Sequence, residues 1–198
     1  MKDILKTIYP LVILAVFFGA VLGLTFQLLE GKINETIQKE ENDALKAVLP
    51  QAAEFEKVTN TASPYYIGYD SQKNIAGYVF KKDKIGYGGP VVTLIGVKPD
   101  RSINNVFILS AASETPGLGY KCTEKAWQAQ FTNLTADKIP GSKADFGKFG
   151  LDVITGATIT SMAVANNLTL AFEQLKEMAP VEIPGAETNT NALKGGVK

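Results

Sequence analysis

A run of hydroxyl-bearing residues at the start of a predicted helix is the segment best suited to chemistry. This segment, called the hydroxyl segment, reads Asp152-Val153-Ile154-Thr155-Gly156-Ala157-Thr158-Ile159-Thr160-Ser161. Helix N-termini present free N–H groups and partial positive charge, so this position suits a phosphate group. The alternative is ordinary N-capping of the helix by Thr160 or Ser161.

Two glycine-rich segments precede it in the chain. The first glycine segment, Ile85-Gly86-Tyr87-Gly88-Gly89-Pro90, comes just before a predicted strand, and its alternative interpretation is a flexible hairpin turn. The second glycine segment, Ser113-Glu114-Thr115-Pro116-Gly117-Leu118-Gly119, lies between a strand and a helix, and its alternative is a tight turn. A dinucleotide-binding GxGxxG is excluded, because Val91 stands three positions after Gly88 and no βαβ unit surrounds it.

The composition excludes most other redox and catalytic chemistry. The 198 residues include no His and a single Cys, Cys122, which excludes His-based catalytic sets, His-ligated zinc or haem, an internal disulfide and an iron–sulfur cluster. Arg101 is the only Arg, so a bidentate arginine clamp on phosphate is nearly excluded. Zero net charge disfavours a nucleic-acid partner. Any redox centre is therefore an organic cofactor held by other groups.

The three segments together resemble the FMN-binding domain family, in which a flavin transferase joins FMN through its phosphate to the last Thr of (Ser/Thr)-Gly-Ala-Thr. Asp152-x-x-Thr155-Gly156-Ala157-Thr158 matches that motif, and Gly86–Pro90 and Glu114–Gly119 match two others in the same order. Over residues 1 to about 178, the chain resembles the G subunits of Rnf-type ion-translocating ferredoxin:NAD oxidoreductases. Ala111-Ala112-Ser113 departs from relatives that carry histidines there.

The resemblance implies a set of site residues. Thr158 is the expected covalent FMN acceptor, and Asp152 is expected to bind metal or orient the hydroxyl during flavin transfer. Glu114 and Thr115 are expected to face the flavin ring. No metal ligand in the finished site and no catalytic residue is predicted. The remaining expected cofactor-binding residues are Thr155, Gly156, Ala157, Thr160, Gly117, Leu118, Tyr87 and Gly88.

The N-terminal elements predict a membrane anchor. Between Lys6 and Glu30 lie 23 uncharged residues, enough for a helix to cross a bilayer. The length of this run and the lack of a small-x-small site after it disfavour a cleaved signal peptide. Residues 30–49 predict a helical stalk, with apolar positions at helical spacing and Pro50 at its end. Flanking lysines at both ends leave the orientation undecided by charge.

The rest of the chain predicts an α+β fold with a mainly antiparallel sheet and packed helices. Closely spaced segments rich in β-branched and aromatic residues predict four strands, at Tyr65–Tyr69, Ile75–Phe80, Val91–Val97 and Ile103–Leu109. Helices are predicted at Cys122–Phe131 and Ser161–Met178, with a loop-rich stretch over 132–150. The expected organisation is an N-terminal flank at 1–6, a transmembrane helix at 7–29, a stalk at 30–49, an FMN-binding domain at 50–180 and a disordered tail at 181–198.

The expected function is electron relay through covalent FMN within an Rnf-type membrane complex. The chain is not expected to be catalytic alone. The resemblance implies the other membrane subunits, the lipid bilayer and a maturing flavin transferase as partners. It also implies a single-pass protein of the cell membrane with a cytoplasmic N-terminus and an extracytoplasmic FMN domain. The alternatives are a part like the C subunits of sodium-translocating NADH:quinone reductases, a cofactor-free membrane assembly protein, and a flavin-dependent sensor or reductase acting alone.

Overall fold

The computed structural model describes residues 2–59 and 63–178, and in its first helix the side chains of residues 9, 10, 12–27 and 39–48. The expected tail at 181–198 lies outside the described residues. The elements in chain order are α1 (Lys2–Val48), β1 (Glu54–Val58), β2 (Tyr65–Tyr69), β3 (Ile75–Ile85), β4 (Pro90–Val97), β5 (Ile103–Ser110), the 3-10 helix η1 (Gly119–Thr123), α2 (Lys125–Gln128), η2 (Ala129–Phe131), η3 (Ala136–Lys138), α3 (Lys143–Lys148) and α4 (Thr158–Glu177).

The five strands form one antiparallel sheet in which each strand pairs with its neighbours in the sequence, in the order β1-β2-β3-β4-β5. The mainly antiparallel sheet expected from the sequence is therefore confirmed. The sequence does not predict β1, because three of the five residues in EFEKV are charged and all five are exposed or half-buried. Such a composition is typical of an edge strand, which has only one partner.

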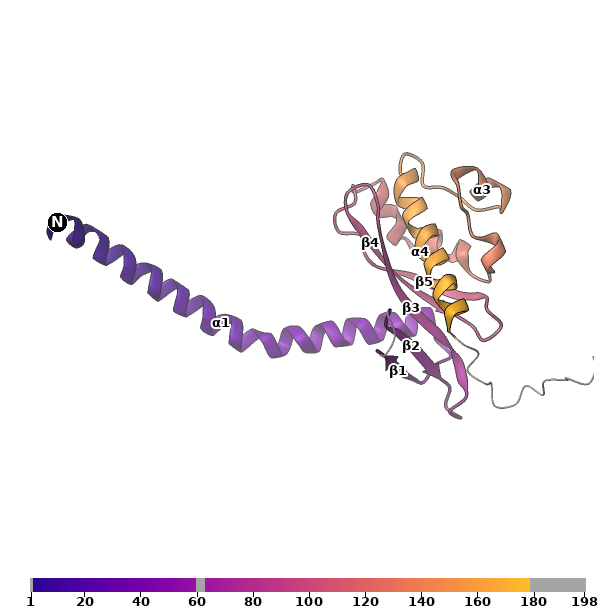
Figure 1. Cartoon of the computed structure of the whole chain (residues 1–198), viewed down its shortest axis with the longest axis horizontal. Helices are drawn as coiled ribbons and strands as arrows, with labels where there is room; N and C mark the ends of the chain where they lie inside the picture. The colour runs from indigo at the N-terminus through magenta and orange to yellow at the C-terminus, as the bar shows by residue number, and fades with distance from the viewer. Residues whose placement is uncertain (1, 60–62, 179–198) are drawn as a thin grey trace, which may run out of the picture.

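Helices cover both faces of the central strands. The α4 helix packs on one face of β3 and β4, and the last turns of α1 pack on the other, where they contact β4 and β5 (Figure 1). Neighbouring residues of β3 alternate accordingly, since Val79 belongs to the core beside α1 and Phe80 to the core beside α4. β4 alternates in the same way at Leu94 and Ile95. Because both faces of β4 are buried, its sequence PVVTLIGV is almost entirely apolar.

The C-terminal end of α1 is built into the domain. Leu45, Val48 and Leu49 are almost fully buried against the sheet. Gly96 of β4 permits this close approach, because a Cβ there would overlap the carbonyl oxygen of Val48. The same carbonyl, which α1 itself leaves unpaired, accepts a hydrogen bond of 2.8 Å from the side-chain amide of Asn104. The end of α1 is thus held by both packing and capping.

The expected membrane span and stalk lie in one continuous helix, α1, that leads away from the domain (Figure 1). The described large apolar side chains between Tyr9 and Phe26 are exposed. Among the residues searched, which are those the structure describes, no helix combines the length and apolarity required of a membrane span.

The segment between β5 and α4 differs in detail from the expected elements. The helix predicted at Cys122–Phe131 is broken into η1, α2 and η2, and the loop-rich stretch contains the short helix α3. The α4 helix begins at Thr158, three residues before the predicted start at Ser161. Its first backbone hydrogen bond runs from the Ser161 N–H to the Ala157 carbonyl. This earlier start places the last hydroxyls of the hydroxyl segment inside the first helical turn.

We predict that Gly96→Ala lowers the free energy of unfolding by about 1–3 kcal/mol, because the added Cβ must displace the end of α1. The matched control is Gly147→Ala in α3, where the Cβ would meet no atom within 4 Å. That control should be neutral or stabilising by about 0.5–1 kcal/mol. Urea unfolding of the full chain in detergent, followed by circular dichroism, measures both. Equal stability of the two variants would contradict the close docking of α1.

Candidate functional site

A buried carboxylate joins the three segments singled out in the sequence. Glu114 of the second glycine segment is only 4% exposed. Its Oε1 accepts hydrogen bonds from the N–H groups of Tyr87 (2.8 Å) and Gly88 (3.2 Å) in the first glycine segment. Its Oε2 accepts a bond of 2.8 Å from the hydroxyl of Thr160 in the first turn of α4. One side chain therefore holds two loops and a helix end together.

The glycines of both segments make room for this carboxylate. A Cβ on Gly86 would overlap Oε1 of Glu114, and a Cβ on Gly119 would overlap Oε2. A Cβ on Gly88 would overlap the Ser113 carbonyl oxygen, so the two loops touch along their backbones. The glycines are required here by the close approach of the segments to Glu114 and to each other.

Among the described residues, no basic side chain bonds to the Glu114 carboxylate. Its three hydrogen-bond donors are two backbone N–H groups and one hydroxyl, all of them neutral. The bond from Thr160 also places the carboxylate beside the N-terminus of the 20-residue helix α4, whose dipole favours a negative charge.

The start of α4 offers further donors toward the surface. Ala157 is its N-cap residue and makes no side-chain capping hydrogen bond. The expected alternative, capping by Thr160 or Ser161, is therefore wrong. The Ser161 hydroxyl instead accepts a bond from the Ile154 N–H at 3.1 Å and donates one to the Ala157 carbonyl. The N–H groups of Thr158, Ile159 and Thr160 have no partner within the helix, and no group among the described residues accepts a bond from them, so they are available to another acceptor.

The hydroxyls of the hydroxyl segment fall into two groups. Thr160 and Ser161 are fully buried, and their hydroxyls are committed to Glu114 and to the backbone. Thr155 is exposed and Thr158, the first residue of α4, is half-buried. The geometry therefore leaves two hydroxyls accessible, and only that of Thr158 lies on the helical turn with unpaired N–H groups.

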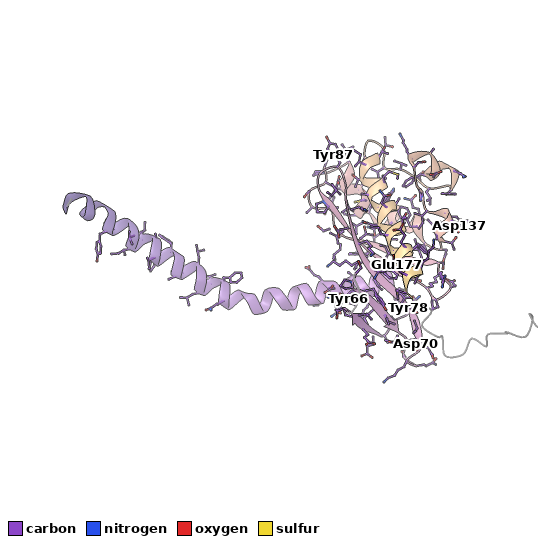
Figure 2. All side chains as sticks on the ribbon, viewed as in Figure 1. Tyr66, Asp70, Tyr78, Tyr87, Asp137 and Glu177 are labelled. Atoms are coloured by element: carbon purple, nitrogen blue, oxygen red, sulfur yellow. The ribbon has the colours of Figure 1, made fainter. Side chains whose placement is uncertain are left out.

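Exposed apolar side chains gather in the same three segments. In the described part of the domain beyond α1, the large apolar residues that stay exposed are Ile85, Tyr87, Leu118, Tyr120 and Ile159. Each lies within, or one residue beyond, a segment that Glu114 joins. Tyr87, which is 73% exposed, lies at the opposite end of the domain from Asp70 (Figure 2). Apolar surface concentrated in this way is typical of a binding site.

The remaining expected site residues lie around this centre. Thr115 and Gly117 are exposed in the second glycine segment. Leu118 lies beside Gly156, since a Cβ on that glycine would be 3.2 Å from its Cδ2 atom. Gly156 has a φ of +79°, a conformation that glycine adopts without strain. Asp152 is exposed at the start of the hydroxyl segment and belongs to no group of three acidic or thiol side chains suited to a metal among the described residues.

Sequence reasoning missed two residues that contact the hydroxyl segment. Trp127 and Gln130 both bind the backbone of Asp152 through their side chains. Trp127 also has a packing role, since its ring contacts Phe131 edge-on, with 5.0 Å between the ring centroids. Side-chain contacts between segments more than 20 residues apart leave no signal in local spacing.

The single cysteine, Cys122, is buried beneath the site, and its thiol is expected to be unreactive. Cys122 is fully buried. Burial, and next the negative charge of Glu114, raise the pKa of its thiol to about 12. At neutral pH the thiol is therefore protonated, and it has neither the exposure nor the thiolate character that a reactive cysteine needs.

Comparison with known proteins identifies a family for this arrangement. Residues 86–173, which contain all three segments apart from Ile85, match the family described as FMN-binding domain. The chain is 35% identical over 182 residues to the G subunit of the ion-translocating oxidoreductase complex of Methanosarcina acetivorans, a match that covers 87% of this chain and 94% of that protein.

Two further relatives carry related names. The chain is 34% identical to the G subunit of the proton-translocating ferredoxin:NAD(+) oxidoreductase complex of Clostridium ljungdahlii, over 68% of this chain and 71% of that protein. It is 30% identical to the G subunit of the Na(+)-translocating ferredoxin:NAD(+) oxidoreductase complex of Acetobacterium woodii, over 90% of this chain and 94% of that protein.

We predict that Glu114→Ala lowers the free energy of unfolding by about 3 kcal/mol, because it leaves two N–H groups and a hydroxyl without their charged acceptor. The matched control is Glu124→Ala, an exposed glutamate nearby that makes no side-chain capping bond to α2. It should change stability by less than about 0.5 kcal/mol. Urea unfolding of the full chain measures both. A loss at Glu114 no larger than that at Glu124 would show that the three segments do not depend on this carboxylate.

We also predict that iodoacetamide alkylates Cys122 at pH 8.5 more than about 100-fold more slowly in the folded protein than in denaturant, since only an accessible thiolate reacts. Intact mass against time measures the two rates. The Cys122→Ser variant, which should gain no mass in either condition, controls for labelling elsewhere. Similar rates in both conditions would place the thiol at the surface.

Proposed function

This chain belongs to the family of G subunits of ion-translocating oxidoreductase complexes, with an FMN-binding domain at residues 86–173, and on that premise we propose that it relays electrons in such a complex through FMN joined to Thr158. The observation that most supports this proposal is the arrangement of the three segments around Glu114. It combines one accessible hydroxyl at an uncapped helix end with the exposed apolar side chains of the domain.

The residues at this end of the domain fit FMN. The first-turn N–H groups of α4 suit its phosphate, and the backbone takes the place of the arginines that the chain lacks. Tyr87 and Leu118 offer apolar surface for an aromatic ring system, and Thr115 and Thr155 add polar groups at its edge. Bound here, FMN supplies electron transfer in single-electron steps, while the protein fixes its position and surroundings.

The covalent link is proposed at Thr158. In the maturation reaction its Oγ forms a bond to the phosphorus of a flavin phosphoanhydride such as FAD. The anhydride P–O bond breaks, the leaving phosphate takes the electron pair, and the hydroxyl proton passes to a base of the flavin transferase. The α4 N-terminus favours the negative charge of the resulting phosphodiester. A covalently held cofactor cannot be lost from a domain outside the cytoplasm.

The same proposal includes the membrane setting. The 23-residue uncharged run at 7–29, with its exposed apolar side chains on α1, supports a single membrane-spanning anchor. We place the N-terminus in the cytoplasm and the FMN domain outside it, with the other membrane subunits of the complex as electron donor and acceptor. The end of α1 is buried in the domain, so the helix that carries the proposed anchor packs directly against the sheet.

We predict that the wild-type chain, produced with its flavin transferase, keeps flavin fluorescence on a denaturing gel, and that Thr158→Ala abolishes that signal. Thr158→Ser should restore it, because serine also offers a hydroxyl. Thr169→Ala, on the exposed side of the same helix, is the matched control and should keep the wild-type signal. A wild-type chain that is colourless after production with the transferase would contradict the proposal and favour a cofactor-free assembly protein.

A further inference from the structure

The backbone of Asp152 is held on both its polar groups by side chains from another part of the chain. Its N–H donates to Oε1 of Gln130 at 2.6 Å. Its carbonyl oxygen accepts bonds from Nε2 of Gln130 at 3.3 Å and from the indole Nε1 of Trp127 at 2.9 Å. The Gln130 amide thus pairs with Asp152 much as a neighbouring β-strand would.

The residues on either side of Asp152 are held as well. The N–H of Leu151 donates to the Phe146 carbonyl at 2.8 Å, and the Leu151 side chain is buried. Ile154 is also buried, and its N–H is bound by the Ser161 hydroxyl. We call the bonds of Gln130 and Trp127 to the Asp152 backbone the clamp. Only Val153 lies between the clamp and Ile154, whose contacts lead into α4.

These bonds fix the backbone of the hydroxyl segment, while the side chains of Asp152 and Thr158 stay accessible at the surface. Every third side chain, at Leu151, Ile154 and Ala157, is buried, and the two residues between each pair are exposed or half-buried. Asp152 and Thr158 are on the accessible side. A segment held in this way presents both side chains to an enzyme with little loss of conformational entropy on binding.

We propose that Gln130 and Trp127 are positioning residues for the transfer of FMN to Thr158, acting through Asp152. This inference rests on the proposed function and adds to it two residues that lie outside the FMN-binding motifs. Gln130 is half-buried and makes no other side-chain hydrogen bond within the described residues, so its amide serves the Asp152 backbone alone. The flavin transferase therefore meets a preformed acceptor segment rather than an unstructured one.

The test is single-turnover transfer of FMN from FAD to the full-length chain by its flavin transferase, followed by in-gel fluorescence. Gln130→Ala should slow transfer about 10-fold or more, because small misplacement of reacting groups is costly. Trp127→Phe, which keeps a ring against Phe131 but removes the indole donor, should slow it to a smaller extent. Gln72→Ala, in the exposed turn between β2 and β3, is the matched control and should leave the rate unchanged.

A second measurement separates positioning from mere stability. Asp152→Asn should slow transfer by itself, and adding Gln130→Ala in that background should cause little further loss of rate. The unfolding free energy should nevertheless fall by the same amount in both backgrounds, because the clamp binds the backbone of residue 152 and not its side chain.

The transfer assay distinguishes failure of FMN attachment at Thr158 from failure of the positioning role of Gln130 and Trp127. If the wild-type chain accepts no flavin at all, the proposed function fails. If the wild type is labelled and Gln130→Ala is labelled at the same rate, the function stands and the positioning role is overturned. Equal fractional loss of rate from Gln130→Ala in the wild-type and Asp152→Asn backgrounds would also overturn it.

Discussion

The carboxylate of Glu114 is the constraint on which this end of the domain depends. Three donors from two other segments converge on it, and glycines stand where any side chain would collide with it. Satisfying a buried carboxylate leaves these loops little freedom, since each donor left unpaired would cost about 1–3 kcal/mol. The two glycine segments and the first turn of α4 therefore surround one buried carboxylate.

The same arrangement shows how this domain can hold anions with no histidine and a single arginine. The chain has no histidine and one arginine, so neither the interior charge nor a phosphate at the surface can rely on them. The N-terminus of α4 serves both purposes. Its inner side faces the Glu114 carboxylate through Thr160, and its outer side carries Thr158 among unpaired N–H groups. The N-terminus of α4 thus stabilises the buried Glu114 carboxylate on its inner side, and its outer side is suited to hold the FMN phosphate.

The sequence predicts the sheet better than it predicts the side-chain contacts of the candidate site. Runs of β-branched and aromatic residues predict four strands, whereas three of the five residues of β1 are charged and give no such signal. The three segments singled out in the sequence meet in space. The resemblance places Glu114 at the flavin ring and counts Thr160 among the cofactor-binding residues, and both remain predictions, although the structure shows these two groups bound to each other. Local spacing carries no information on such a bond between residues 46 positions apart.

The contacts that fix the hydroxyl segment are hidden from sequence for the same reason. Gln130 and Ser161 are ordinary polar residues at helix ends, and only the fold brings their side chains to the backbone of Asp152 and Ile154. Likewise, the apolar spacing of residues 30–49 indicates a stalk, but only the structure shows that its last turn completes a hydrophobic core under the sheet. Long-range side-chain-to-backbone bonds determine the geometry of this site.

The assembly around Glu114 leaves Thr158 as the accessible hydroxyl at the start of α4, and we propose that FMN is attached there. Fragmentation mass spectrometry of the peptide that contains Thr155 and Thr158, from the chain isolated out of its own membranes, tests this attachment. We expect an added mass of FMN less water, localised to Thr158. An unmodified peptide, or a flavin localised to Thr155, would contradict it.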